Sequence, residues 1–400
     1  MHHLRHRGRF GYRLVFATVC IALIARPSAQ GQLRPSPWAL AGTSSELIER
    51  LREDPFTYFR FINRAWTTRV CDAFAGVTDV PIVRLHGDAH VEQFALSKDA
   101  WGLDDFDDSA RGPLFVDIVR FLGSIDLAAR QRGWSRDRDA LWNRFLEGYR
   151  RGLSTPGYRP SEPDIVRQLR RRTSVTRAAF LEWAEGQMRP MDRATSMSVV
   201  AGMEAFERFV RRERTDLAPG YFAVVRAGWL NIGIGSAATR KVLIRVQGPT
   251  ADPEDDEVLE AKEVTNLGGL SCLEGPTAPP ALRIVDGARQ LGRVKHDILA
   301  VGPTLLIAAA ADRSEHWLDW WVNSWEPSYH EIRVKELRSA RDLAAIAYDA
   351  GVQLSAGEPR DITVRRQVQS SVMRLEGRLK SETSAIVEEL LAGWRELRGS

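Results

Sequence analysis

Apolar residues recur at helical spacing over several stretches of the chain. The spacing i, i+3, i+4, i+7 predicts a helix with one buried face. It follows Asp117 at Ile118, Phe121, Leu122 and Ile125, and a similar face is formed by Leu141, Phe145 and Tyr149. We expect further helices over residues 46–52, 165–183, 197–211, 343–354 and 362–397, and a Pro/Gly-rich loop over residues 153–163.

Strand patterns are confined to two parts of the chain. Residues 82–85 predict a short strand that runs directly into His86-Gly87-Asp88. Residues 241–247 and 258–264 flank an acidic Pro/Gly loop, a pattern that predicts an antiparallel hairpin with a long turn, and we expect more strand in residues 320–337. Helices, then strands, then helices again predict an α+β fold with a small sheet lobe beside a helical lobe.

The chain divides into four predicted parts. These are a signal peptide (residues 1–31), a helical lobe with the candidate loops (32–220), a β-rich lobe (221–337) and C-terminal helices that pack on the helical lobe (338–400). In the first part a basic stretch precedes twelve uncharged residues, too few to span a bilayer, which takes about 20. We therefore expect export, to the periplasm; a short membrane anchor and a misassigned start codon are the alternatives. No later segment is long and apolar enough to cross a membrane.

The charge lies mainly at the N-terminus. The formal net charge of the 400 residues is +4, but residues 1–31 hold five arginines and no acid, so the remainder carries −1. This balance gives no support to nucleic-acid binding, and we expect no nucleic-acid partner. A composition that is 44% hydrophobic and 27% charged is typical of a folded globular protein.

Three cysteines occur, and Cys20 lies in the predicted signal peptide. Cys71 and Cys272 are far apart, and neither has a neighbour at metal-ligand spacing. A single disulfide is possible in an oxidising compartment; two buried thiols are the favoured interpretation.

Two acidic segments carry the candidate chemistry. The strand ending in His86-Gly87-Asp88 places a carboxylate on a tight turn, where glycine permits unusual dihedral angles. A second cluster, Asp104 to Asp108, follows about 17 residues later and can face it. Phosphoryl transfer needs one carboxylate to align the attacking hydroxyl and accept its proton, and another to hold Mg²⁺. The alternative is a pair of polar turns with solvated acids, since crowded carboxylates repel one another.

These residues resemble a known pattern. His86-Gly87-Asp88, then Gln93, Asp105-Phe106-Asp107 and Asp117, resemble the catalytic loop and metal-binding motif of the protein-kinase-like superfamily, with the aminoglycoside phosphotransferase branch closest. The chain is more similar still to the bacterial domain-of-unknown-function family 2252, over most of its length after residue 46. That resemblance is carried by Pro55-Phe56, Tyr58, Arg60, Gly87 to His90, Asp105 to Asp108, Gly112-Pro113, Asp117, Gly233 to Ser236 and Lys262-Glu263.

The resemblance implies a role for each matching residue. Asp88 would be the catalytic aspartate that positions the nucleophile, with His86 stabilising its loop and Asp117 hydrogen-bonding that loop from below. Asp105 would bind the metal, with Asp107 beside it. Gln93 stands where the family has an asparagine that ligates a second metal, and its side chain is one methylene longer.

A glycine-containing loop and a lysine come later in the chain. Backbone amides near Gly233, Gly235 and Ser236 could cover phosphates, although an ordinary turn is the alternative and Ala238 replaces the third glycine. Lys262 is one of only six lysines in a chain that has fifty arginines. Its compact ammonium group, in the middle of a predicted strand, could contact phosphate oxygens. The alternative is a solvent-facing lysine. Asp286 is a candidate for its carboxylate partner.

The order of these parts differs from that of kinases. The catalytic loop comes about 145 residues before the glycine-containing loop, and the helix at 343–354 resembles the one that normally leads into the catalytic loop. We infer a circular permutation cut just before the His-Gly-Asp strand, which is tolerated when the old termini lie close together. The inference requires Lys262 to meet the acidic turns across one cleft.

Three functions remain open. The first is a kinase-like phosphotransferase that uses Mg²⁺ and ATP on an unknown hydroxyl-bearing acceptor. The second is an exported, catalytically degraded kinase fold that binds a ligand or partner without turnover, which Gln93, Ala238 and an ATP-poor compartment favour. The third is a metal-dependent hydrolase that uses His86-x-Asp88-x-His90 with Asp105 and Asp107.

Overall fold

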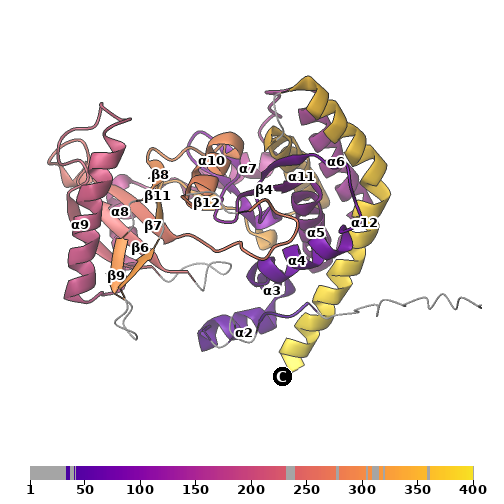
Figure 1. Ribbon diagram of the computed structural model, residues 1–400, viewed down its shortest axis with the longest axis horizontal. Coiled ribbons are helices and arrows are strands. Elements are labelled where there is room, and N and C mark those ends of the chain that lie inside the picture. Colours follow the sequence, from indigo (N-terminus) through magenta and orange to yellow (C-terminus); the bar gives the residue numbers. More distant parts are fainter. Residues whose placement is uncertain are drawn as a thin grey trace, which may run out of the picture. The chain divides into compact units, whose positions relative to one another are not determined.

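The structure is a computed structural model, shown in Figure 1. It describes residues 33–36, 40, 42–230, 239–275, 279–302, 305–308, 315–318, 320–357 and 361–399. The predicted signal peptide and the loop at residues 233–236 lie outside the described residues. The described part confirms the predicted α+β class, because helices and antiparallel sheets both occur in it.

Helices make up most of the described chain. In chain order they are α2 (Ser45–Glu53), α3 (Pro55–Phe61), α4 (Asn63–Ala73), α5 (Phe115–Gln131), α6 (Arg138–Ser154), α7 (Asp164–Thr173), α8 (Arg177–Gly186), α9 (Arg193–Val210), α10 (Leu282–Leu291), α11 (Ala340–Leu354) and α12 (Ile362–Gly399). The strands are β1 (Ile82–Leu85), β2 (Phe94–Leu96), β3 (Trp101–Leu103), β4 (Ala110–Pro113), β5 (Val224–Trp229), β6 (Lys241–Val246), β7 (Glu257–Glu263), β8 (Leu299–Val301), β9 (Leu305–Ala308), β10 (Glu315–Leu318), β11 (Trp320–Ser324) and β12 (His330–Glu331).

Helix α5 runs through the largest hydrophobic core. Every residue from Phe115 to Ala129 is buried, and α3, α4, α6, α11 and α12 all pack against this helix (Figure 1). Two glycines let α6 and α11 approach closely. A Cβ on Gly148 would lie 2.0 Å from the carbonyl oxygen of Tyr348, and one on Gly351 would lie 2.2 Å from that of Phe145. Side chains are therefore excluded at both positions.

The five-stranded antiparallel sheet has the order β5-β6-β7-β11-β8. Alternate residues of a strand point to opposite faces, and the two faces of this sheet pack differently. Val242, Ile244 and Ala261 pack with α9 on one face. Leu243 and Val258, on the other face, pack with α8. Lys241, Glu260 and Lys262 share this second face by the same alternation.

One pair of short strands and one small three-stranded sheet lie next to the candidate loops. β1 pairs with β4, and β12, β2 and β3 form a three-stranded antiparallel sheet. The turn after β1 and the segment between β3 and β4 are the two acidic segments singled out in the sequence.

Most predicted elements occur within a few residues of their expected bounds. The predicted hairpin is β6–β7, paired antiparallel from Lys241–Lys262 to Val246–Glu257. The helix expected over residues 165–183 is instead two helices, α7 and α8, because Ser174 is extended and Thr176 caps α8 by accepting a hydrogen bond from the amide of Ala179. Within the part of the chain that is described, no helix combines the length and apolar character needed to cross a membrane.

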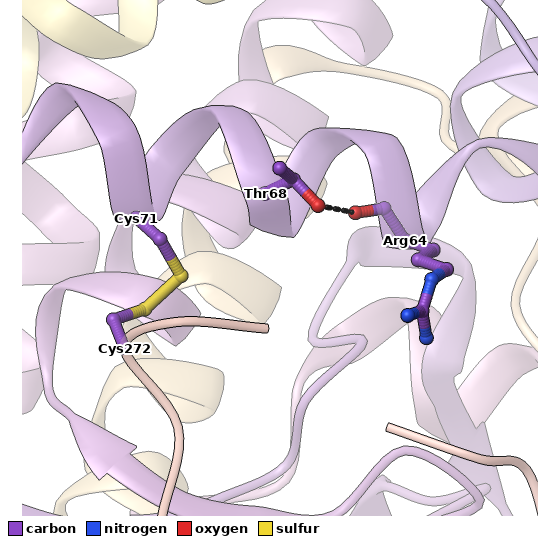
Figure 2. The surroundings of a disulfide bond; sticks show 4 residues. All are labelled: Arg64, Thr68, Cys71 and Cys272. Carbon is purple, nitrogen blue, oxygen red and sulfur yellow. Dashed lines mark hydrogen bonds between the residues drawn. A yellow bond between two sulfur atoms is a disulfide. The ribbon is translucent and has the colours of Figure 1, made fainter. Parts of the chain in front are cut away.

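Cys71 and Cys272 form a disulfide, shown in Figure 2. The interpretation favoured from sequence, two buried thiols, is wrong. The two cysteines are separated by 201 residues, and only folding brings α4 against the segment that follows β7. Arg64, also on α4, donates to the carbonyl oxygens of Asn266 and Gly268 in that same segment. The disulfide and the hydrogen bonds of Arg64 thus both attach the segment after β7 to α4.

Candidate functional site

A cavity of about 1030 Å³ brings the two acidic segments together with the sheet. Its lining includes Asp88, Gln93 and the acids Asp104, Asp105, Asp107 and Asp108 from the loops; Lys241, Glu260, Lys262 and Trp321 from the sheet; Phe180 and Trp183 from α8; and Arg60, Glu331 and Arg333. The sequence prediction that Lys262 meets the acidic turns therefore agrees with the geometry.

The His-Gly-Asp turn is fixed from below by Asp117. Its two carboxylate oxygens accept hydrogen bonds from the amides of His86, at 2.7 Å, and Gly87, at 2.9 Å. Gly87 has a φ of 87°, and a Cβ there would lie 1.9 Å from the carbonyl oxygen of Asp108. Only glycine fits this position. This is the contact that the resemblance implied for Asp117.

His86 supports the turn from inside the protein. The side chain is fully buried. Its Nε2 lies 2.9 Å from the carbonyl oxygen of Asp104, and its Nδ1 accepts from the amide of Asp88 at 3.3 Å. Both ring nitrogens therefore have protein partners, which fits the stabilising role implied for His86 and leaves no nitrogen for the reaction.

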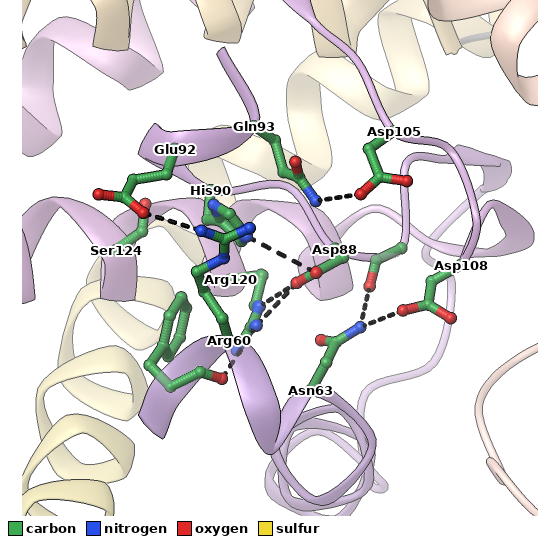
Figure 3. A network of polar contacts seen from close by, with 12 residues as sticks. Arg60, Asn63, Asp88, His90, Glu92, Gln93, Asp105, Asp108, Arg120 and Ser124 are labelled. Atoms are coloured by element: carbon green, nitrogen blue, oxygen red, sulfur yellow. Dashed lines mark hydrogen bonds and ion pairs between the residues drawn. The ribbon is translucent and has the colours of Figure 1, made fainter. Parts of the chain in front are cut away.

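Asp88 is held by an arginine that sequence analysis missed. Arg120 of α5 places Nε at 2.9 Å and Nη2 at 2.7 Å from Asp88 Oδ1 (Figure 3), and its guanidinium lies 3.5 Å from the ring centre of Phe59. Burial raises the pKa of Asp88 to about 6, against the opposing charge of Arg120. An arginine between the apolar pairs Ile118-Val119 and Phe121-Leu122 was the available signal, because a buried charge requires a partner.

His90 approaches the other oxygen of Asp88. Its Nε2 lies 3.6 Å from Asp88 Oδ2, and the ring is fully buried beside Phe56 and Phe59. Neither ring nitrogen has a hydrogen-bond partner among the residues that the structure describes. Burial and the charges of Arg60 and Arg120 hold the pKa of His90 well below its ordinary value, so the ring is neutral.

The wall beside Asp88 is a closed network of ion pairs. Arg60 Nη1 lies 2.9 Å from Glu92 Oε2, and Arg333 bridges Glu92, at 3.3 Å, and Glu331, at 2.8 Å. Part of this network is drawn in Figure 3. Arg60 comes from α3, whose start is fixed by Asp54, the N-cap that accepts from the amides of Phe56 and Thr57.

Lys262 contacts three carboxylates. Its Nζ lies 3.2 Å from Asp105 Oδ1, 3.5 Å from both oxygens of Asp107 and 3.8 Å from Glu260 Oε2. Burial works to lower the pKa of Lys262, but the charges of Asp105 and Asp107 outweigh it and raise that pKa. The ammonium is therefore charged. A solvent-facing lysine is excluded, since the residue is 8% exposed.

Asp286 is not the partner of Lys262. It lies on α10 and pairs with Arg84, at 3.5 Å. Glu260, two residues before Lys262 on the same strand face, takes the expected place beside the ammonium. The period-two spacing of the strand was the signal for this pair.

The residues near Asp105 offer oxygen atoms of the kind that a magnesium ion prefers. Gln93 Nε2 donates to Asp105 Oδ2 at 3.2 Å, while Gln93 Oε1 is buried and has no hydrogen-bond partner among the described residues. Carboxylate and amide oxygens suit Mg²⁺. Asp105, Asp107 and Gln93 could thus hold the ion, and the orphaned amide oxygen is the observation that supports the fit.

The histidine-based metal site of the hydrolase alternative is absent from the described part of the chain. No three His, Cys, Asp or Glu side chains there are grouped to hold a metal ion. His86 and His90 turn toward different partners, Asp104 and Asp88. Because Gly87 breaks the alternation of the strand, the x-spaced trio does not converge.

His296 pairs with Asp104 on the sheet side of the cavity, and sequence analysis missed this pair as well. His296 Nε2 lies 3.3 Å from Asp104 Oδ1, and its Nδ1 lies 2.8 Å from the carbonyl oxygen of Ser324. Burial opposes the charge of His296, but Asp104 outweighs it and raises the pKa of His296 to about 9. The acids of this loop are therefore not the solvated set of the alternative interpretation.

Aromatic side chains line the cavity near α8. Trp183 is 52% exposed, and its ring centre lies 5.7 Å from that of Trp325. Trp325 donates through Nε1 to Glu260 Oε2 at 2.8 Å, which links the aromatic wall to Lys262. Gly233, Gly235 and Ser236, predicted to cover phosphates, lie outside the described residues.

Comparison with known proteins identifies one family. Residues 46–169 match the family model described as "Uncharacterized protein conserved in bacteria (DUF2252)". No curated protein and no solved structure matched the chain. The matched segment holds Asp88, Gln93, Asp105, Asp107 and Asp117, whereas Lys262 lies beyond it. Over residues 46–169 the chain is therefore similar to this uncharacterised bacterial family, which the resemblance in the sequence had named.

Proposed function

We propose that the protein is a kinase-like phosphotransferase that uses Mg²⁺ and ATP on a hydroxyl-bearing acceptor. One observation carries the proposal. Lys262 and Asp105, which are 157 residues apart in the chain, are in contact inside the cavity that Asp88 also lines. A lysine for phosphates, carboxylates for a metal and an aspartate for the hydroxyl are the parts that phosphoryl transfer requires.

We further propose that the chain is a circularly permuted two-lobe kinase-like fold. The end of α11 supports this arrangement. Gly357, in the turn after α11, packs so closely on β1 that a Cβ there would lie 2.2 Å from the carbonyl oxygen of Arg84. Gln353 of α11 also donates to the carbonyl oxygen of Leu103 and accepts from its amide. An unpermuted chain could thus pass from α11 directly into β1 and the His-Gly-Asp turn.

The residues then have distinct tasks. Lys262 binds phosphate oxygens, and Asp105, Asp107 and Gln93 hold Mg²⁺, which neutralises phosphate charge when bound. Asp88 accepts the proton of the acceptor hydroxyl at Oδ2, because Oδ1 is occupied by Arg120.

The aromatic wall suits the base of the nucleotide. Trp183 and Trp325 present partly exposed rings next to the carboxylate of Glu260, and apolar Phe180 and Leu230 lie beside them in the cavity lining. Planar bases bind such surfaces by stacking. The glycine-containing loop at 233–236 would cover the phosphates, as the sequence indicates.

We also propose that the protein is exported to the periplasm. The disulfide between Cys71 and Cys272 supports this location, since disulfides persist in oxidising compartments. The basic and apolar pattern of residues 1–31 supports it independently.

Titration calorimetry with Mg·ATP tests the phosphotransferase proposal. We expect saturable binding that depends on Mg²⁺ and falls at least tenfold in Asp105→Asn. Asp139→Asn, whose carboxylate is exposed and does not line the cavity, is the matched control and should bind as the parent protein does. A folded protein that does not bind Mg·ATP would refute the proposal.

A binding protein without turnover is the second candidate. It is favoured by the buried ion pair of Asp88 and Arg120, which occupies one oxygen of the proposed base. Release of ADP from Mg·ATP, with water or an added polyol taking the phosphoryl group, distinguishes the two functions. Turnover that Asp88→Asn abolishes, with nucleotide binding retained, would support the transferase. Nucleotide binding without any release would support the second candidate.

A further inference from the structure

Lys241 is the second lysine of the candidate site. The pairing of β6 with β7 places Lys241 directly opposite Lys262, and residues opposite one another in a sheet point to the same face. Both side chains line the cavity, and they are 6% and 8% exposed. Two of the six lysines of the chain thus share one spot on a sheet.

Two lysines placed side by side in a buried position lower the stability of the folded protein unless nearby groups offset their charge. Like charges directly opposite in a sheet destabilise it, and a buried position strengthens their repulsion. The carboxylates of Asp105, Asp107 and Glu260 offset that cost. Lys262 contacts all three, and the charge of Lys241 also acts on Asp105 and Asp107.

The same carboxylates are the proposed metal ligands. Once Asp105 and Asp107 hold a divalent cation, they no longer neutralise both ammonium groups. The two adjacent buried ammonium groups then attract an anionic ligand more strongly. A chain of phosphates offers each ammonium a phosphate group of its own, since neighbouring strands lie about 5 Å apart.

We propose that Lys241 is a second phosphate-binding lysine, so that the site selects a chain of two or more phosphates over a single phosphate group. The inference rests on the proposed nucleotide site and adds its ligand class. A second consequence follows from the shared carboxylates. Mg²⁺ and the phosphate chain should each tighten the binding of the other, because binding free energies are coupled reciprocally.

The test compares ligands of different phosphate number on matched variants. Calorimetry is run with Mg²⁺ and ATP, inorganic tripolyphosphate or AMP, on the full-length parent protein and on Lys241→Met, Lys241→Arg and Lys262→Met. Lys295→Met is the control, since Lys295 is exposed and does not line the cavity. We expect Lys241→Met to weaken ATP and tripolyphosphate at least tenfold and AMP less than threefold. Lys241→Arg should retain most of the affinity.

Each contrary result has a distinct meaning. Parental affinity for tripolyphosphate in Lys241→Met, together with a loss in Lys262→Met, would overturn the role of Lys241 and leave the proposed function standing. Absence of binding of both ATP and tripolyphosphate to the folded parent protein would overturn both.

A labelling experiment on the parent protein needs no folded variant. An acyl-phosphate derivative of ATP acylates lysine amines beside its bound phosphates, and the acylated peptides are identified by mass spectrometry. We expect label on both Lys241 and Lys262, and excess tripolyphosphate should block it. Label on Lys262 alone would overturn the inference.

Discussion

Two charged regions of the cavity differ in their charge balance. In the Asp88 region, the guanidinium groups of Arg60, Arg120 and Arg333 face three carboxylates, those of Asp88, Glu92 and Glu331. In the Lys262 region, Lys241 and Lys262 face three carboxylates, those of Asp105, Asp107 and Glu260. They also share the cavity with Gln93, whose Oε1 has no hydrogen-bond partner among the described residues.

The difference indicates what each region is for. Equal numbers of paired positive and negative side chains keep their geometry without a ligand. The Asp88 region therefore holds the carboxylate of Asp88 in a preorganised position. Surplus acid and an unpartnered amide oxygen are costly in the protein alone, and a bound cation would satisfy both. We therefore expect substitutions in the Asp88 region to affect stability most, and those in the Lys262 region to affect ligand binding most.

The largest expected effect is that of Arg120→Met. It removes the partner of a buried carboxylate, and breaking a buried ion pair in this way costs about 3–5 kcal/mol of unfolding free energy. Urea unfolding followed by circular dichroism measures the loss. Arg144→Met, which removes an exposed pair with Glu147, is the matched control and should cost about 0–1 kcal/mol. Equal losses in the two variants would show that the Asp88 region is not preorganised by this pair.

Sequence reasoning found what local pattern or residue identity could specify. Helical spacing predicted α5 and α12, and strand pattern predicted the β6–β7 hairpin. The family resemblance pointed to Asp88, Asp105 and Asp117, and the scarcity of lysine pointed to Lys262. All of these signals lie within short stretches of chain or in composition.

The missed features depend on which distant segments meet. Arg120 pairs with Asp88 only after α5 packs beneath the His-Gly-Asp turn, and the disulfide forms only when the segment after β7 reaches α4. Glu260 was passed over in favour of Asp286, although the period-two spacing of the strand was a local signal for it. Nothing local in the sequence specifies that Arg120 meets Asp88 or that Cys71 meets Cys272.

A smaller effect is expected from the pH dependence of His296. Asp104 raises the pKa of His296 from 6.5 to about 9 although burial opposes it. The stabilisation is therefore fully present below about pH 6.5 and is lost as the pH rises through 9. We expect His296→Gln to lower the unfolding free energy by about 2–3 kcal/mol at pH 6 and by much less at pH 9.5.

Urea unfolding of the parent protein and His296→Gln at both pH values checks this prediction. The difference between the two proteins cancels the titration of groups that do not interact with His296. A difference that stays constant between pH 6 and pH 9.5 would contradict it, and would mean that the Asp104–His296 pair does not balance charge in the Lys262 region.

The smallest effect has the opposite sign and distinguishes the two regions most directly. Burial and the charge of Asp105 raise the pKa of Asp107 above its ordinary value, so the ionised form costs the folded state free energy near neutral pH. Asp107→Asn removes that cost, and we expect it to leave the unfolding free energy unchanged or to raise it by about 1 kcal/mol at pH 7. A carboxyl whose pKa is raised by folding destabilises the folded state only above its pKa in the unfolded chain, about 4. The gain in unfolding free energy from Asp107→Asn should therefore vanish at pH 4. Urea unfolding at pH 7 and pH 4 measures this difference. A loss of stability like that of Arg120→Met would instead mean that Asp107 is a matched partner of Lys262, and the contrast between a preorganised region and a ligand-binding region would no longer hold.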